Sequence, residues 1–313
     1  MKNSLLFDSI SSRMGITRVD LSMVKRFRLV DLSRFIKEMA SPSGGLVIGT
    51  SDSWRRRITM ALNRTNRGKM RRSVVFVMGG SSLDDPRYAH ALSNYKAVYV
   101  ETEGMKRNYE AMGLLNVRVF PNCRKRREAD IVIGGHQGRL SCVYFSLISE
   151  EKGAPLILDV ASMLPSVDFH MYGRIDPAIE DGFLKCCDEL DNVHYHGVFD
   201  SVEGYAIAEL SQYDIHLFPS LCPNEGVPGV LVETKMAGVP TIASDRCFNG
   251  ELVQDGETGF VLTDISAESF ASAIRKFDSD RQMLMGMKYA SLRSAERFYI
   301  EKYIDDIVST LAD

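Results

Sequence analysis

Residues 217–245 read LFPSLCPNEGVPGVLVETKMAGVPTIASD, and this stretch predicts the fold of the second half of the chain. Residues 215–218 form a short apolar run that is typical of a buried strand. Apolar side chains then recur with helical spacing over residues 230–237, until a Gly-Val-Pro sequence ends the pattern. Residues 241–244 resume as a strand. The sequence therefore predicts a strand, a glycine-rich loop, a helix and a second strand.

The glycine-rich loop has the properties of a diphosphate site. Its residues are Gly226, Val227, Pro228 and Gly229, directly before the predicted helix. The first N–H groups of a helix lack partners within the helix, and the helix dipole places partial positive charge there. Glycine has no Cβ and lets the backbone approach a ligand closely. We therefore expect these four residues to bind a diphosphate.

Two carboxylates frame this loop. Glu225 precedes the predicted helix, and Glu233 lies about one turn inside it. Anions beside a phosphate would repel it, so these side chains are better suited to accept hydrogen bonds from the hydroxyls of a sugar or a ribose. On spacing alone, an ordinary βαβ crossover with a surface glutamate at each end explains the pattern equally well.

The ordered pattern PSxxPNEGxPGxxxExxxxGxPxIASD resembles the donor-binding motif of glycosyltransferase family 4, the retaining GT-B enzymes among the glycosyl transferases of group 1. The resemblance covers residues 97–277 and extends more faintly to the start of the chain. It implies an α/β GT-B fold of two Rossmann-like domains facing across a cleft, with a reduced first domain. We expect an acceptor-side domain at residues 1–130, a nucleotide-sugar domain at 131–290, and a C-terminal helix at 291–313 that packs back towards the first domain.

The resemblance also assigns residues outside the central motif. The GITRV wording places Gly15 beside the donor diphosphate, and the EKG wording makes Lys152 a cation on the donor phosphates. A predicted strand ends at Gly173, the usual edge of a nucleotide pocket. The chain departs from the family pattern twice, because Leu147 stands where an arginine is expected and Met78 stands near the place of a histidine.

The expected function is transfer of a sugar from a nucleotide-sugar to a hydroxyl acceptor with retention. Lys152 and the helix N–H groups would neutralise the departing diphosphate, Glu225 would position the sugar, and Glu233 would bind the ribose. We expect no metal, provided that Lys152 and the helix N–H groups suffice for the leaving charge, and no cofactor besides the donor itself. The departures at Leu147 and Met78 favour an alternative, a homologue that binds nucleotide-sugar or glycan with little or no turnover.

Charge is divided unevenly along the chain. The net charge of −3 combines +14 over residues 1–140, from 26 Lys and Arg and 12 Asp and Glu, with −17 over the remainder. The densest basic stretch contains Arg55, Arg56 and Arg57 beside Trp54. This pattern predicts docking on an anionic membrane with a lipid-linked sugar acceptor, although a solvated helix face explains it too. Nucleic acid is not expected as a partner, since no binding motif accompanies the charge.

Composition describes an ordinary soluble protein. Of 313 residues, 45% are hydrophobic and 25% are charged, which suits two domains. No run of 18 apolar residues exists, and the start MKNSLLFDSI does not read as a signal peptide. Six cysteines without a Cys-x2-Cys pair indicate reduced thiols rather than zinc. We therefore expect a cytoplasmic protein that can be peripheral at the inner membrane face.

Four further expectations concern local structure. Residues 5–10 are predicted as a first strand, and residues 124–138 as a polar linker. The family-like sequence at residues 249–259 predicts a hairpin with Asp-Gly turn chemistry. Helices are expected at residues 281–287 and 288–312.

Overall fold

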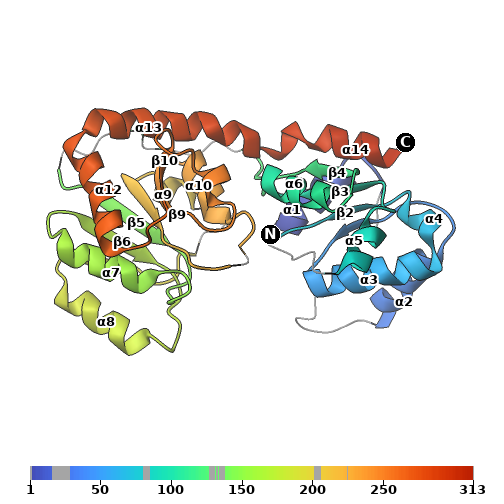
Figure 1. Cartoon of the computed structure of the whole chain (residues 1–313), viewed down its shortest axis with the longest axis horizontal. Coiled ribbons are helices and arrows are strands. Elements are labelled where there is room, and N and C mark those ends of the chain that lie inside the picture. The colour runs from blue at the N-terminus through green and yellow to red at the C-terminus, as the bar shows by residue number, and fades with distance from the viewer. Residues whose placement is uncertain are drawn as a thin grey trace. The chain divides into compact units, whose positions relative to one another are not determined.

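The computed structural model describes residues 2–15, 29–79, 85–126, 131, 133, 138–200, 206–223 and 225–312. The chain divides into two compact units. Figure 1 colours the chain by residue number, so the elements of each unit can be found by their labels. Unit 1 comprises Met1–Arg126 and Phe298–Asp313, and unit 2 comprises Arg127–Arg297. The last segment of the chain therefore belongs to the same unit as the first.

The described part of unit 1 contains one sheet of four parallel strands, in the order β1-β2-β3-β4. Its elements are α1 (Lys2–Ser11), α2 (Leu29–Ala40), β1 (Val47–Gly49), α3 (Asp52–Thr65), α4 (Arg67–Met70), β2 (Val74–Phe76), α5 (Pro86–Leu92), β3 (Ala97–Val100), α6 (Glu103–Ala111), β4 (Val117–Val119), the 3₁₀ turn η2 (Ile300–Lys302) and α14 (Ile304–Ala312).

The core of unit 1 joins its sheet to the end of the chain. Phe76 of β2 stacks on Tyr99 of β3 with ring centroids 4.7 Å apart, and Phe120 meets Phe76 edge to face at 5.3 Å. Ile304 and Ile307 of α14 are buried in the same cluster. Burial of this apolar surface is what holds the first and last segments of the chain together.

The described part of unit 2 contains six strands, and all neighbouring strands pair in parallel in the order β10-β9-β8-β5-β6-β7. Its elements are β5 (Ser141–Phe145), α7 (Ala154–Met163), β6 (Asp168–Tyr172), α8 (Glu180–Glu189), β7 (Val193–Tyr195), α9 (Ile207–Leu210), β8 (Ile215–Phe218), α10 (Gly229–Met236), β9 (Thr241–Ser244), α11 (Asn249–Leu252), β10 (Gly259–Leu262), α12 (Ala267–Ser279) and α13 (Arg281–Ser294), with the 3₁₀ turn η1 (Ala295–Phe298) at the boundary. Parallel α/β structure in both units confirms the predicted fold class.

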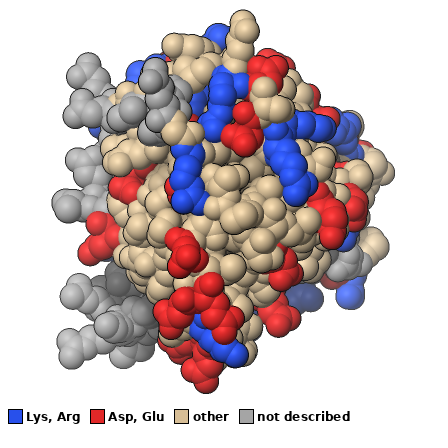
Figure 2. Space-filling model, turned by 90° about the vertical axis from the view of Figure 1, so that its left-hand side faces the viewer, with Lys and Arg blue, Asp and Glu red and all other residues tan. Residues whose placement is uncertain are grey.

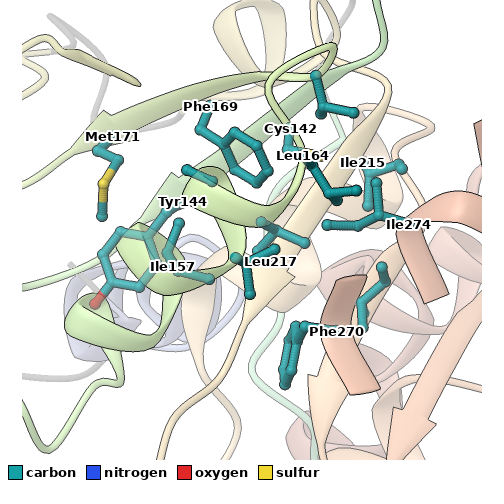
Figure 3. Packing of buried hydrophobic residues seen from close by; sticks show 14 of the residues in the cluster. Cys142, Tyr144, Ile157, Leu164, Phe169, Met171, Ile215, Leu217, Phe270 and Ile274 are labelled. Carbon is teal, nitrogen blue, oxygen red and sulfur yellow. The ribbon is translucent and has the colours of Figure 1, made fainter. Parts of the chain in front are cut away.

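Both faces of the unit 2 sheet are covered. Alternation along β5 directs Cys142 and Tyr144 into a core with side chains of α7 and α12, such as Phe270 (Figure 3). Val143 points to the other face, where it joins a second cluster that includes Leu210 of α9. The sheet is thus a layer between two apolar clusters.

The first predicted strand is wrong. The segment forms α1 instead, with Leu6 and Ile10 buried four residues apart on one helix face. Contact with α14 selects the helix, because residues at this spacing bury together only in helical conformation. Most of the predicted linker at 124–138 lies outside the described residues.

The hairpin prediction is also wrong. Residues 249–252 form α11, and the turn that follows leads into β10, which pairs in parallel with β9. The predicted break at residue 287 is displaced as well, because α13 continues to Ser294. The chain becomes irregular where Arg124 exchanges backbone hydrogen bonds with Phe298 and Ile300, and this pairing interrupts the helix.

None of the described helices is both long enough and apolar enough to cross a membrane.

Candidate functional site

The order of strands in unit 2 locates a site. From β5 the chain moves outward through β6 to β7, then returns to the other side of β5 as β8 and continues outward through β9 to β10. The direction of winding therefore reverses between β5 and β8. In open parallel sheets, ligands bind at the carboxyl ends of the strands beside such a switch point.

The two predicted catalytic side chains meet at this point. Lys152 lies in the loop after β5, Glu225 lies in the loop after β8, and the Lys152 ammonium donates to Oε1 of Glu225. The Ser220 hydroxyl donates to Oε2 of Glu225 at 2.7 Å. Both carboxylate oxygens are thus engaged, while the two charged side chains keep 19% and 16% of their surface exposed. Hydrogen bonds fix the position of the pair, and its exposed surface is accessible to a ligand.

Close packing of the two loops fixes this geometry. Gly153 has φ 72°, and a Cβ on it would lie 2.4 Å from the carbonyl oxygen of Pro219. The backbone N–H of Leu221 donates to the carbonyl of Glu151 at 2.8 Å. A glycine next to Lys152 is therefore required both by backbone conformation and by the approach of the second loop.

Tyr144 of β5 is hydrogen-bonded to the loop that follows β5 and carries Lys152. Its ring is buried in the sheet, and its hydroxyl donates to the carbonyl of Leu147 at 2.7 Å and lies 3.3 Å from that of Lys152. Burial raises the pKa of Tyr144, so the phenol stays neutral and remains a donor. The Leu147 side chain, which replaces the expected arginine, is 37% exposed.

Helix α10 begins beside the ion pair. It starts at Gly229 after Pro228, whose side chain makes no capping hydrogen bond, so the first turn presents backbone N–H groups. Gly226 and Val227 are buried between Glu225 and the helix. Glu233 lies one turn inside α10, as predicted, and is only 9% exposed. The residues assigned to donor binding in the central motif are therefore contiguous with the Lys152–Glu225 pair.

Gly173 follows β6, on the side of β5 away from β8. A Cβ at this position would lie 1.8 Å from the carbonyl oxygen of Ser146, so only glycine allows the loops after β5 and β6 to come this close. Its N–H donates to the carbonyl of Gly197, which follows β7. Gly173 thus lies at the same end of the sheet as Lys152, one strand along from it.

The remaining predicted site residues belong to unit 1. Gly15 is exposed and follows α1, so the strand that was expected before it is a helix. Residues 16–28, which follow Gly15, lie outside the described residues. Met78 follows β2 and packs against the apolar core of unit 1.

Arg55 contradicts its predicted place on a membrane-facing surface. Its side chain is 0% exposed, donates to the Asp52 carboxylate, and donates to the Tyr88 hydroxyl at 3.0 Å. Arg56 is partly buried, with Nε 2.8 Å from Asp52 and its guanidinium over the Tyr88 ring. These partners make burial of the guanidinium tolerable and reassign Arg55 to the interior of unit 1.

Arg57 remains at the surface, where its guanidinium lies over the Trp54 ring. Further along the same basic stretch, several arginines are exposed. These are Arg64, Arg67, Arg71 and Arg72. The basic surface is therefore carried by the later part of α3, by α4 and by the turn after it.

The sequence did not reveal every participant in the site. Ser220 stands within the quoted PSxxPNEG pattern, but its spacing gave no sign that it would bind Glu225. Tyr144 reads as an ordinary core residue of a strand, and its contact with the Lys152 carbonyl depends on the loop geometry.

The sequence model of the family described as Glycosyl transferases group 1 matches residues 126–293, more than half of the chain. The chain belongs to this family. A curated relative of this group 1 chain is an uncharacterized 41.2 kDa protein in the cps region of Klebsiella pneumoniae, 26% identical over 154 residues. That match spans 49% of this chain and only 40% of the Klebsiella protein.

Solved structures share the fold of this group 1 chain. Anabaena Alr3699/HepE in complex with UDP has a TM-score of 0.71 at 16% identity, covering 90% of this chain and 82% of that one. The pneumococcal O-GlcNAc transferase GtfA in complex with UDP and GlcNAc has a TM-score of 0.68 at 17% identity, covering 90% and 59%. These similarities confirm the predicted GT-B fold class.

Proposed function

We propose that the chain is a retaining glycosyltransferase of the family 4 type, which moves a hexosyl group from a nucleotide-sugar to a hydroxyl acceptor. The observation that carries this proposal is the Lys152–Glu225 pair at the switch point of unit 2, directly before α10. Membership in the glycosyl transferases group 1 family supports it. Structural neighbours in complex with UDP, with UDP-glucose, and with UDP and GlcNAc support it as well.

In this proposal the side chains act by position and charge. As the bond between the anomeric carbon and the phosphate oxygen breaks, the Lys152 ammonium and the N–H groups at the start of α10 stabilise the growing charge on the diphosphate. Glu225 accepts hydrogen bonds from the sugar, and Glu233 from the ribose. The acceptor oxygen attacks the same face of the sugar and passes its proton to the departing phosphate, so no protein nucleophile is needed.

Leu147 favours a second candidate function. A leucine with 37% of its surface exposed beside Lys152 supplies no charge, so one bidentate phosphate contact of the family pattern is missing. A homologue that binds nucleotide-sugar without efficient turnover would show this feature. Gly173 and the α10 loop would serve such a binder equally well.

A screen of donor hydrolysis across common nucleotide-sugars separates the two candidates. A transferase should release nucleoside diphosphate from one donor faster than the buffer control, and more so with acceptor. Calorimetric binding of that donor without release would establish the non-catalytic binder. Neither binding nor release with any donor would contradict both.

Glu233→Ala is expected to weaken nucleotide binding by about 1–3 kcal/mol, the scale of a lost hydrogen bond to a charged group. The expectation follows from its place one turn inside α10, next to the donor loop. Titration calorimetry with UDP measures it. Glu189→Ala on the exposed end of α8 is the control and should bind as the wild type does. Equal affinity of a folded Glu233→Ala protein would remove Glu233 from the site.

We further propose that the acceptor is a lipid-linked sugar of polysaccharide, lipopolysaccharide or glycolipid assembly, reached at an anionic membrane surface from the cytoplasmic side. The Klebsiella relative from a cps region supports this role. The distribution of charge supports docking on the membrane through unit 1. Figure 2 shows Asp and Glu gathered at the lower end of the face that carries α8, whereas the exposed arginines of α3 and α4 belong to unit 1.

Liposome binding tests this surface. The wild type should sediment with anionic vesicles at low salt and be released by added salt, since each basic residue near such a surface contributes about 1 kcal/mol. The triple variant Arg57→Ser, Arg64→Ser, Arg67→Ser loses three such contributions and should bind about 100-fold more weakly.

The control for charge alone is a triple variant on unit 2, Lys185→Ser, Arg275→Ser, Lys276→Ser, which also removes three exposed cations. It should bind anionic vesicles as the wild type does. Equal loss of binding in both variants, or equal binding of the wild type to neutral and anionic vesicles, would rule out a docking surface on unit 1.

A further inference from the structure

Two cysteines from different loops meet beside the candidate site. Cys222 lies in the loop after β8, and Cys247 lies in the turn after β9. The Cys247 thiol donates to the carbonyl oxygen of Cys222, with 3.3 Å between sulfur and oxygen. Both residues are thiols, Cys247 being exposed and Cys222 partly exposed. The sulfur of one cysteine thus already touches the backbone of the other.

Cys247 also has an unusual backbone. Among the described residues it is the one non-glycine residue with positive φ, at 50°. This conformation is costly for a residue with a Cβ and persists only where its surroundings impose it. Here Asn249 donates to the carbonyl of Ser244 at 3.0 Å, and the Ser244 hydroxyl donates to the carbonyl of Ser220 at 2.6 Å. The two segments that carry the cysteines are therefore joined independently of the thiols.

We propose that Cys222 and Cys247 are a redox modification site that forms a reversible disulfide under peroxide. The Cys247 sulfur attacks hydrogen peroxide, forming a sulfenic acid as one water leaves. The Cys222 sulfur then attacks the sulfenic sulfur, and the S–S bond forms as a second water leaves. Two thiols are oxidised, one peroxide is reduced to two waters, and a dithiol reductant reverses the change.

The described alternatives are less suited to this reaction. Cys123 and Cys142 are buried, and burial raises the pKa of the Cys142 thiol. Cys186 and Cys187 are neighbours within α8, where the helix directs adjacent side chains apart. Cys222 and Cys247 alone combine exposure, contact and origin from two separate loops among the described cysteines.

The disulfide would act on the ion pair. In the reduced form the Cys247 sulfur contacts the Cys222 carbonyl oxygen, and we expect formation of the S–S bond to turn Cys222 within its loop. That loop carries Ser220 before Cys222 and Glu225 after it, which are hydrogen-bonded to each other. Turning Cys222 therefore displaces the groups that hold Glu225 against Lys152. This consequence rests on the proposed function of the site, whereas disulfide formation does not.

The chemical test is mass spectrometry after treatment of the full chain with hydrogen peroxide. The wild type should lose two of its six thiols, its mass should fall by two hydrogen atoms per crosslink, and a peptide should join Cys222 to Cys247. The control variant Cys186→Ser should form the same crosslink, and Cys247→Ser should not. A crosslink between other cysteines, or oxidation that stops at sulfinic acid on Cys247, would overturn the proposal.

The functional test is UDP affinity before and after oxidation. Oxidised wild type should bind about tenfold or more weakly, which is the fold-change expected for the loss of about one hydrogen bond to a charged group. Dithiothreitol should restore binding, and Cys247→Ser should be insensitive to peroxide. A confirmed crosslink with unchanged affinity would overturn the regulatory role. If reduced protein binds no nucleotide, the proposed function fails while the crosslink is judged by its mass alone.

Discussion

Lys152→Ala is expected to lower kcat/KM for the donor by about 100-fold or more, the scale of losing one preorganised electrostatic contact in an active site. Lys152 is the side-chain cation that the structure places at the switch point, against Glu225. Leu147 provides no second charge in the same loop. The loss should fall mainly on kcat, since the charge on the leaving diphosphate grows towards the transition state.

The ion pair complicates this experiment, because removing Lys152 also leaves Glu225 without its cation. A double-mutant cycle with Glu225→Gln separates the two effects. Lys152→Arg is the matched control that keeps the charge and should retain most of the activity. Activity of Lys152→Ala within a few-fold of the wild type, with the fold intact, would show that Lys152 is not the cation on the donor. Leu147→Arg should raise donor affinity if the missing charge limits binding.

Gly153→Ala is expected to lower the free energy of unfolding by about 2–5 kcal/mol, from a strained positive φ and a clash in a packed site. The new Cβ would lie 2.4 Å from the backbone oxygen of Pro219, which cannot move away as a flexible side chain would. Relief of the clash must push the loops after β5 and β8 apart and separate Lys152 from Glu225. Donor turnover should therefore fall together with stability.

Gly256→Ala is the matched control. Gly256 has φ 73°, close to the 72° of Gly153, but a Cβ there would meet nothing within 4 Å. It should cost only the conformational part, about 1–2 kcal/mol. Urea denaturation of both variants measures the difference. Equal destabilisation would mean that backbone conformation alone explains the need for Gly153.

The sequence predicted the central βαβ unit well, because its signals are local. Pro219 ends a short apolar strand, glycines surround the start of α10, and apolar side chains then recur with helical spacing. The same reasoning failed for residues 5–10, where a six-residue segment with four apolar residues suits a strand or a helix. Its choice depends on α14, almost the whole chain away.

Contacts between distant residues account for the other differences. The resemblance assigned Lys152 and Glu225 separately, but their contact joins residues 73 positions apart and depends on the order of β5 and β8. Arg55 reads as part of a solvated basic run, and only the position of Tyr88 shows that it is enclosed. Charge in a sequence predicts the composition of a surface but not which members reach it.

The return of the last segment to unit 1 has a consequence for synthesis on the ribosome. Arg127–Arg297 is a continuous stretch, so unit 2 can complete its sheet while translation is still under way. Most of unit 1 is synthesised first, but its hydrophobic core is completed last, because Ile304 and Ile307 complete the core around Phe76. Until these residues emerge, its nascent sheet lacks part of its apolar cover. A premature stop after residue 297 would therefore destabilise unit 1, which is made first, and leave unit 2 intact.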